Sequence, residues 1–229
     1  MTQPFDSGPG YPQATIPPQQ RIHLAVERRA DSDYVFSFWT ALGWSILTCG
    51  IFGIYVLYKL FQRSVEHNRR RIEVLDAATA LAWERAQAAG RGEELTPMFQ
   101  AVGTQIAEMR RIDAQFRDPA IWALIGILSG IGTIVGYVFL DQDLCSHDAA
   151  ERNAEDQLGA IFAALGTPIS LGPAPAPKGR HNVVNRVLAL IFTGGIYALW
   201  WLYDLMVEGN ANYRTDWARE DAMLVALGV

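Results

Sequence analysis

The chain has 229 residues, of which half are hydrophobic and 19% are charged, and its net charge is −5. Globular proteins carry about 25% charged residues, so this chain is apolar for its length. The negative net charge argues against nucleic acid as a partner, because phosphate binding requires a concentrated basic surface. The two cysteines, Cys49 and Cys145, provide neither a disulfide framework nor a set of metal ligands, and we expect two unpaired thiols.

Three stretches concentrate the hydrophobic residues. Residues 34–58, 119–140 and 187–203 contain no Asp, Glu, Lys or Arg. Uninterrupted apolar stretches of this kind are typical of transmembrane helices. The sequence therefore predicts an all-α integral membrane protein of the cell membrane, with transmembrane helices at 34–58, 119–140 and 183–203.

Polar segments precede and follow the first apolar stretch. Residues 1–33 combine a Pro- and Gln-rich tail, which we expect to be disordered, with a polar approach to the membrane. Residues 59–118 predict two amphipathic helices that pair as a hairpin; the alternative is two separate helices at the membrane surface. The first of them continues the membrane helix, and its positions at spacings of three and four are Phe61, Val65, Asn68, Ile72, Leu75, Thr79 and Ala82.

A break at 88–94 separates the two helices of this hairpin. Thr96 followed by Pro97 predicts the N-cap and first residue of the second helix. Its apolar face consists of Phe99, Val102, Ile106, Met109 and Phe116.

The remaining segments lie on either side of the last apolar stretch. Residues 141–182 predict a short helix at 149–165 and a Pro-rich connector, and residues 204–229 predict a polar C-terminal helix. In the second apolar stretch, the small residues fall at spacings that allow close helix packing, within or between chains. They are Gly126, Gly130, Gly132 and Gly136.

The chain contains an internal repeat. Shifting the sequence by 145 positions places residues 46–58 over residues 191–203, with six of thirteen residues identical. A shift of 80 positions gives a weaker match in the second apolar stretch, which lacks the threonine, so a third copy is unproven.

The repeated residues resemble a known motif. The first copy has Thr48, Gly50, Ile51, Tyr55 and Tyr58, and the second has Thr193, Gly195, Ile196, Tyr197 and Trp201. This pattern resembles the bacterial membrane-protein family catalogued as domain of unknown function 4234, whose motif reads roughly Thr-Leu-Gly-Ile-Tyr-x-x-Tyr-Trp. The first copy departs from it at Cys49 and Phe52. The resemblance implies a small multi-span membrane protein and no particular reaction.

Glycine beside threonine marks a place where a membrane helix can bend or stop. Each copy is therefore either a single kinked span or an element that turns near Gly50 or Gly195 and re-enters the same side. The sequence favours the kinked span, because 25 uncharged residues suit one crossing. Lys and Arg divide 12 to 7 between the two sides of the resulting topology, which places the hairpin and the C-terminus in the cytoplasm.

Sequence motifs of hydrolases, nucleotide-binding proteins and zinc sites are absent, and we expect no enzyme activity and no cofactor. Some polar residues look like ligands, but the predicted topology puts them on opposite sides of the membrane; they are Glu66, His67, Asn68, His147 and Asp148. We expect contact with anionic lipid head groups from Arg69, Arg70 and Arg71.

These observations predict a protein that acts through contacts. We expect a scaffold, adaptor or subunit of a membrane protein assembly, with the lipid bilayer, other membrane proteins or copies of itself as partners. The alternative is a small channel or transporter component formed by oligomerised repeats.

Overall fold

The computed structural model describes residues 16–115, 118–171 and 182–228. These residues are helical with connecting turns, which confirms the all-α prediction. The helices in chain order are α1 (Pro18–Glu27), α2 (Arg29–Ser32), α3 (Phe38–Leu47), α4 (Ile51–Ala88), α5 (Gly92–Asp113), α6 (Pro119–Leu128), α7 (Gly130–Ala164), α8 (Val183–Phe192) and α9 (Tyr197–Leu227).

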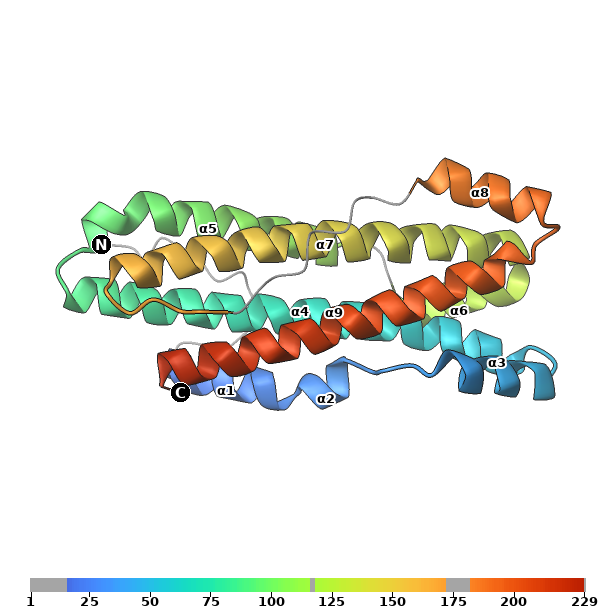
Figure 1. The fold of residues 1–229 in the computed structure, drawn as a ribbon, viewed down its shortest axis with the longest axis horizontal. Coiled ribbons are helices and arrows are strands. Elements are labelled where there is room, and N and C mark those ends of the chain that lie inside the picture. Colours follow the sequence, from blue (N-terminus) through green and yellow to red (C-terminus); the bar gives the residue numbers. More distant parts are fainter. Residues whose placement is uncertain (1–15, 116–117, 172–181, 229) are drawn as a thin grey trace.

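Four long helices form an elongated bundle (Figure 1). Helix α7 packs against α4, α5 and α9, and α5 also packs against α4. The short helices α1 and α2 lie along α4. The other short helices, α3, α6 and α8, gather at one end of the bundle, where each packs against the long helix that follows it in the chain.

Each predicted transmembrane segment is broken near its middle. Residues 34–58 divide into α3 and α4, with a turn at 48–50, and residues 183–203 divide into α8 and α9, with a turn at 193–195. Residues 119–140 divide at Ser129, which has an extended backbone. The prediction of one continuous helix in each segment is wrong, and so is the preference for a kink. The chain reverses at Gly50 and Gly195, because both residues adopt a left-handed φ, +93° and +96°.

These reversals change the predicted topology. After each hairpin the chain returns to the same bundle, so that the second half of α7 packs against α5. The sequence had placed residues 59–118 and 141–182 on opposite sides of a membrane, and the described parts of these segments instead share one helical body. Among the described residues, none of the helices has both the length and the hydropathy that a bilayer crossing requires.

The hairpin of α4 and α5 confirms the pairing predicted for residues 59–118. The predicted start of its second helix is wrong: α5 begins at Gly92, and Pro97 lies inside it. Left-handed Gly90 ends α4, and the chain re-enters a helix directly, so Thr96 does not cap it. The Thr96 hydroxyl instead donates to the Gly92 carbonyl.

Two other predicted segment boundaries are wrong. The helix predicted at 149–165 is the second half of α7, which continues through 141–148 because no Gly or Pro interrupts it. Part of the predicted N-terminal tail and polar approach forms α1 and α2, since Ile22 and its neighbours bury an apolar face against the bundle. The tail before residue 16 and the connector at 172–181 lie outside the described residues, as does Phe116.

The bundle interior has two separate apolar cores. One lies between α1, α5 and the distal halves of α4, α7 and α9. The other lies at the hairpin end, around Phe61, Trp122 and Trp201. On α4 the core at the hairpin end stops at Phe61, and the other core begins at Ile72. Buried charged side chains lie between these cores, near the centre of the molecule, and on α4 they include Arg63, Arg70 and Arg71.

Three of the four glycines predicted to allow close packing do so within the chain. A Cβ at Gly126 would meet Leu57 Cδ2 at 2.6 Å, and one at Gly132 would meet the Ile125 carbonyl oxygen at 2.8 Å. A Cβ at Gly136 would lie 3.3 Å from Phe61, whereas one at Gly130 would meet open space.

Candidate functional site

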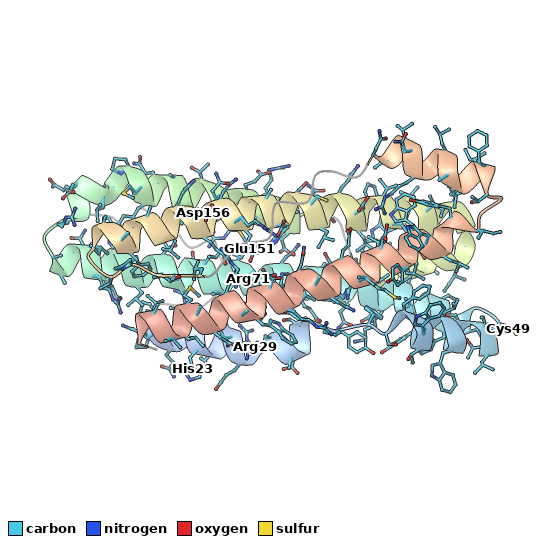
Figure 2. The ribbon with its side chains drawn as sticks, viewed as in Figure 1. His23, Arg29, Cys49, Arg71, Glu151 and Asp156 are labelled. Carbon is cyan, nitrogen blue, oxygen red and sulfur yellow. The ribbon has the colours of Figure 1, made fainter. Side chains whose placement is uncertain are left out.

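Exposed apolar side chains gather at the hairpin end of the bundle. Of the 24 large apolar residues that are exposed in the described chain, 19 lie within residues 38–55, 119–135 and 183–200. We call the exposed apolar side chains of these three segments the apolar end. Cys49 marks its extreme tip (Figure 2). The three short helices of this end, α3, α6 and α8, finish on large exposed residues, namely Leu47, Leu128 and Phe192.

In the first turn of the apolar end, every backbone N–H group from residue 48 to residue 53 donates a hydrogen bond to an acceptor in the same hairpin. The Thr48 hydroxyl donates to the Trp44 carbonyl at 2.7 Å and accepts from the Phe52 N–H at 2.9 Å. The Gly50 N–H reaches back to the Ser45 carbonyl at 2.7 Å. Threonine and glycine are therefore both needed here: one caps the backbone, and the other allows the left-handed conformation.

The second copy of the repeat makes the same turn bond for bond. The Thr193 hydroxyl donates to the Ala189 carbonyl and accepts from the Tyr197 N–H, while the Gly195 N–H reaches the Leu190 carbonyl. Helices α3 and α8 also correspond residue for residue at the shift of 145. At the third hairpin the cap is different, because the Ser129 hydroxyl accepts from the Gly132 N–H.

The other motif residues occupy two environments. Ile51 and Ile196 are exposed to nearly the same extent, 72% and 73%, and Tyr55 is exposed. Trp201 is completely buried, and Arg186 lies over its ring. Tyr58 and Tyr197 are partly buried. The motif therefore builds both the turn and the packing beneath it.

Replacing Thr48 with valine is expected to destabilise the protein by about 1–2 kcal/mol, since it keeps the side-chain shape and leaves the Phe52 N–H unpaired. Thermal or urea unfolding followed by circular dichroism measures the change. Thr104→Val is the control, because that hydroxyl donates only to the Gln100 carbonyl on an exposed face. Equal losses in the two variants would contradict a capping role.

A network of ion pairs occupies the layer between the two apolar cores. Arg71, which is 1% exposed, pairs with Glu151, Glu155 and Glu220, and Arg70 pairs with Glu220 and Asp33. We call the connected set the central ion network; its members are Asp33, His67, Arg70, Arg71, His147, Glu151, Glu155, Asp216, Arg219 and Glu220. Arg71 and Glu151 lie near the middle of the bundle (Figure 2).

The central ion network contains more acid than base. It has five carboxylates against three guanidinium groups, so two negative charges are left when every carboxylate is ionised and both histidines are neutral. Burial and the nearby charge of Glu151 raise the pKa of Asp216 well above its ordinary value. Burial also raises the pKa of Glu155. Asp216 and Glu155 therefore hold a proton more tightly than isolated carboxyl groups do.

A small cavity of about 20 Å³ opens beside the network. Both imidazoles of the network, His67 and His147, line it together with Glu151 and Asp216. Burial lowers the pKa of His67, so the neutral ring is favoured. Asp33 Oδ1 lies 2.9 Å from His67 Nδ1, and a carboxylate can only accept, so Nδ1 carries the proton and Nε2 presents a lone pair.

The structure corrects the role predicted for two of the three consecutive arginines. Arg70 and Arg71 are 3% and 1% exposed and belong to the central ion network, so they are not available to lipid head groups. Their guanidinium groups point into the bundle because the buried carboxylates of α7 and α9 lie there. Arg69 is exposed and pairs with Asp113 at 3.2 Å.

Four of the five polar residues that resemble ligands in the sequence lie at one cavity. The His67 and His147 rings lie 6.2 Å apart, and Asn68 and Asp148 line the same cavity. Glu66 is separate and accepts from the Gln62 amide. Sequence reasoning had kept these residues apart because it relied on membrane crossings between them.

The sequence analysis missed six of the ten residues of the central ion network. The missed residues are Asp33, Glu151, Glu155, Asp216, Arg219 and Glu220. One signal was present: the polar residues at 212, 216, 219 and 220 recur at helical spacing on one face of α9. Helical spacing of polar residues ordinarily marks a solvated face, and here that face is buried against α4 and α7.

Comparison with protein-family models, curated protein sequences and solved structures finds no match to this chain. The candidate sites are therefore interpreted from their geometry and chemistry alone.

Proposed function

We propose that this protein is a membrane-attached helical scaffold whose apolar end inserts into one leaflet of the cell membrane. Support comes from the distribution of side chains: exposed apolar residues gather on three hairpins at one end of the bundle (Figure 2). Contiguous exposed apolar surfaces of this kind mark interaction sites. The hairpin segments 38–55, 119–135 and 187–200 contain no charged residue.

The dimensions of the hairpins suit one leaflet. Helices α3, α6 and α8 each have ten residues, which corresponds to about 15 Å. The hydrocarbon core of a bilayer is about 30 Å thick, so each hairpin reaches about its midplane. The first charged residues beneath the tips include Lys59, Asp141 and Arg186, which would then lie at the level of the head groups.

The observation that carries the proposal is the backbone pairing in the turns. Water is absent from the hydrocarbon core, so an unpaired N–H group there costs several kcal/mol. The turns at 48–53 and 193–198 leave no backbone N–H unpaired, although their side chains are highly exposed. In water such complete pairing is unnecessary, since solvent can bind a free N–H.

The helical body would project from the membrane and present its helix faces to partners. Helix α4 alone has 38 residues, or about 57 Å. Other membrane proteins or a second copy of this chain are the partners that fit a scaffold or adaptor. A channel has less support, because the hydroxyls of Thr48 and Thr193, which would line its path, are hydrogen-bonded to the backbone of the turns.

Vesicle flotation tests the insertion. We expect the wild type to float with phosphatidylcholine–phosphatidylglycerol vesicles, and the triple variant Leu47→Glu, Leu128→Glu and Phe192→Glu to stay in the dense fraction. A charged side chain within the hydrocarbon core costs about 2.5 kcal/mol or more. All three residues are at least 75% exposed, so the fold should be unaffected, and circular dichroism checks this.

The matched control carries Leu24→Glu and Val225→Glu, two exposed apolar residues outside the apolar end. This variant should float like the wild type. A wild type that stays in the dense fraction, or a triple variant that floats equally well, would refute insertion. Affinity purification from the native membrane tests the scaffold role separately: reproducible partners support it, and a lone monomer contradicts it.

A further inference from the structure

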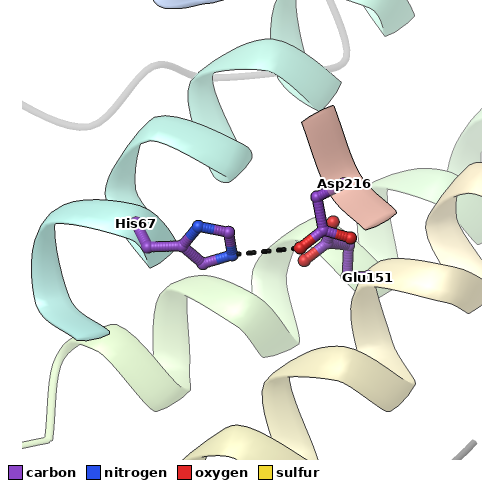
Figure 3. A group of neighbouring side chains, drawn as sticks. All are labelled: His67, Glu151 and Asp216. Carbon is purple, nitrogen blue, oxygen red and sulfur yellow. Dashed lines mark ion pairs between the residues drawn. The ribbon is translucent and has the colours of Figure 1, made fainter. Parts of the chain in front are cut away.

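Three buried side chains from three different long helices converge at the cavity in the central ion network. His67 comes from α4, Glu151 from α7 and Asp216 from α9 (Figure 3). One ligand atom of each lies within 4.8 Å of the others. We propose that these side chains bind a divalent transition-metal cation of the Zn²⁺ or Mn²⁺ class, which ties the three helices together.

The contact between His67 and Asp216 fits shared coordination of an ion better than a hydrogen bond. His67 Nε2 lies 3.5 Å from Asp216 Oδ2, which is beyond the usual N–H···O range of about 2.7–3.2 Å. Two ligands on one tetrahedral ion, with bonds of about 2.0–2.1 Å, are about 3.4 Å apart. Because Asp33 accepts from Nδ1, the Nε2 lone pair is directed at the carboxylate, and a cation between them satisfies both acceptors.

A second imidazole at the same cavity carries an unpaired nitrogen. His147 is 3% exposed and lines the cavity, yet its Nε2 has no hydrogen-bond partner among the described residues. Its Nδ1 lies 3.4 Å from Glu151 Oε2. Buried polar atoms are paired in the great majority of cases, so an unpaired imidazole nitrogen here indicates a missing partner. The cavity volume of about 20 Å³ accommodates one ion.

The surroundings match this ion in charge and in outer contacts. With all five carboxylates ionised, the two excess negative charges of the central ion network equal the charge of one divalent cation. Asp33 fixes the orientation of His67, and Arg71 holds Glu151, as outer residues do around metal sites. Imidazole with carboxylate favours a transition metal over Mg²⁺ or Ca²⁺, which prefer oxygen ligands.

Calorimetric titration of the chelator-treated full chain with Zn²⁺ tests the proposal. We expect one ion per chain. The variants His67→Gln and Asp216→Asn should bind about 100-fold more weakly or worse. Asp33→Asn, which changes the outer contact to His67 and the ion pair with Arg70, should bind about 10–100-fold more weakly. His23→Gln is the control, because His23 is an exposed histidine on α1, and it should bind like the wild type.

Spectroscopy of the wild type covers the case in which a variant does not fold. Bound Co²⁺ should give the intense absorption of a low-coordinate site, and Zn²⁺ should displace it. A wild type that leaves Co²⁺ with the weak spectrum of the free ion would overturn the proposal. So would binding that His67→Gln and Asp216→Asn leave unchanged in folded protein, or binding of Mg²⁺ as tight as that of Zn²⁺. None of these outcomes depends on vesicle binding.

Discussion

Replacing Arg71 with alanine is expected to destabilise the protein by about 3–5 kcal/mol, which is enough to unfold many domains. The guanidinium group of Arg71 is buried and pairs with Glu151, Glu155 and Glu220. Without it, three buried carboxylates lose their main counter-charge. Urea unfolding followed by circular dichroism gives the free energy of unfolding.

Arg69→Ala is the matched control, two positions away on the same helix. Its side chain is 65% exposed and, within the described parts of the chain, pairs only with Asp113, so we expect a change in the free energy of unfolding within about 0.5 kcal/mol. A similar loss in both variants would contradict the burial of Arg71. If Arg71→Ala proved as stable as the wild type, the central ion network would not be a structural element.

A second large effect is expected from Phe61→Ala, which should destabilise the protein by about 3–5 kcal/mol. Phe61 is completely buried and stacks on Trp122 with ring centroids 5.4 Å apart. Truncation opens a cavity in the apolar core beneath the hairpins. The same unfolding experiment measures the loss.

Phe192→Ala changes the same residue type at a position that is 85% exposed. In the absence of lipid, its free energy of unfolding should stay within about 0.5 kcal/mol of the wild-type value. The two variants should rank the other way in vesicle binding: Phe192→Ala should bind vesicles more weakly than folded Phe61→Ala does. If Phe192→Ala bound vesicles as well as the wild type, this tip would not contribute to insertion.

The sequence predicted the helical body well, because its periodicity is a local signal. Of the seven positions at spacings of three and four between Phe61 and Ala82, all are buried except Val65, which is partly buried. The repeat at 46–58 and 191–203 also corresponds to equal turns. The choice between kink and reversal was beyond the sequence, since 25 uncharged residues can form one long helix or two short ones. The left-handed φ of Gly50 decides it, and φ is not readable from composition.

The central ion network could not be assembled from the sequence for a different reason. Asp33, His67 and Asp216 are far apart in the chain and meet only once the bundle is closed. Consecutive charges such as those at 69–71 usually face solvent, and only the packing of α9 across α4 and α7 shows otherwise. An incorrect membrane topology then separated residues that the fold brings into contact.

The central ion network lies between two apolar cores, and this arrangement opposes sliding of the long helices along one another. A shift of α9 by one turn, about 5.4 Å, would carry Arg219 and Glu220 away from Glu155 and Arg71 and set them against alkyl or aromatic side chains. A uniformly apolar interface would tolerate such slippage at little cost. The opposite charges thus fix the axial register of α9 against α4 and α7, which keeps the hairpin of α8 and α9 at the same end of the bundle as the other two hairpins.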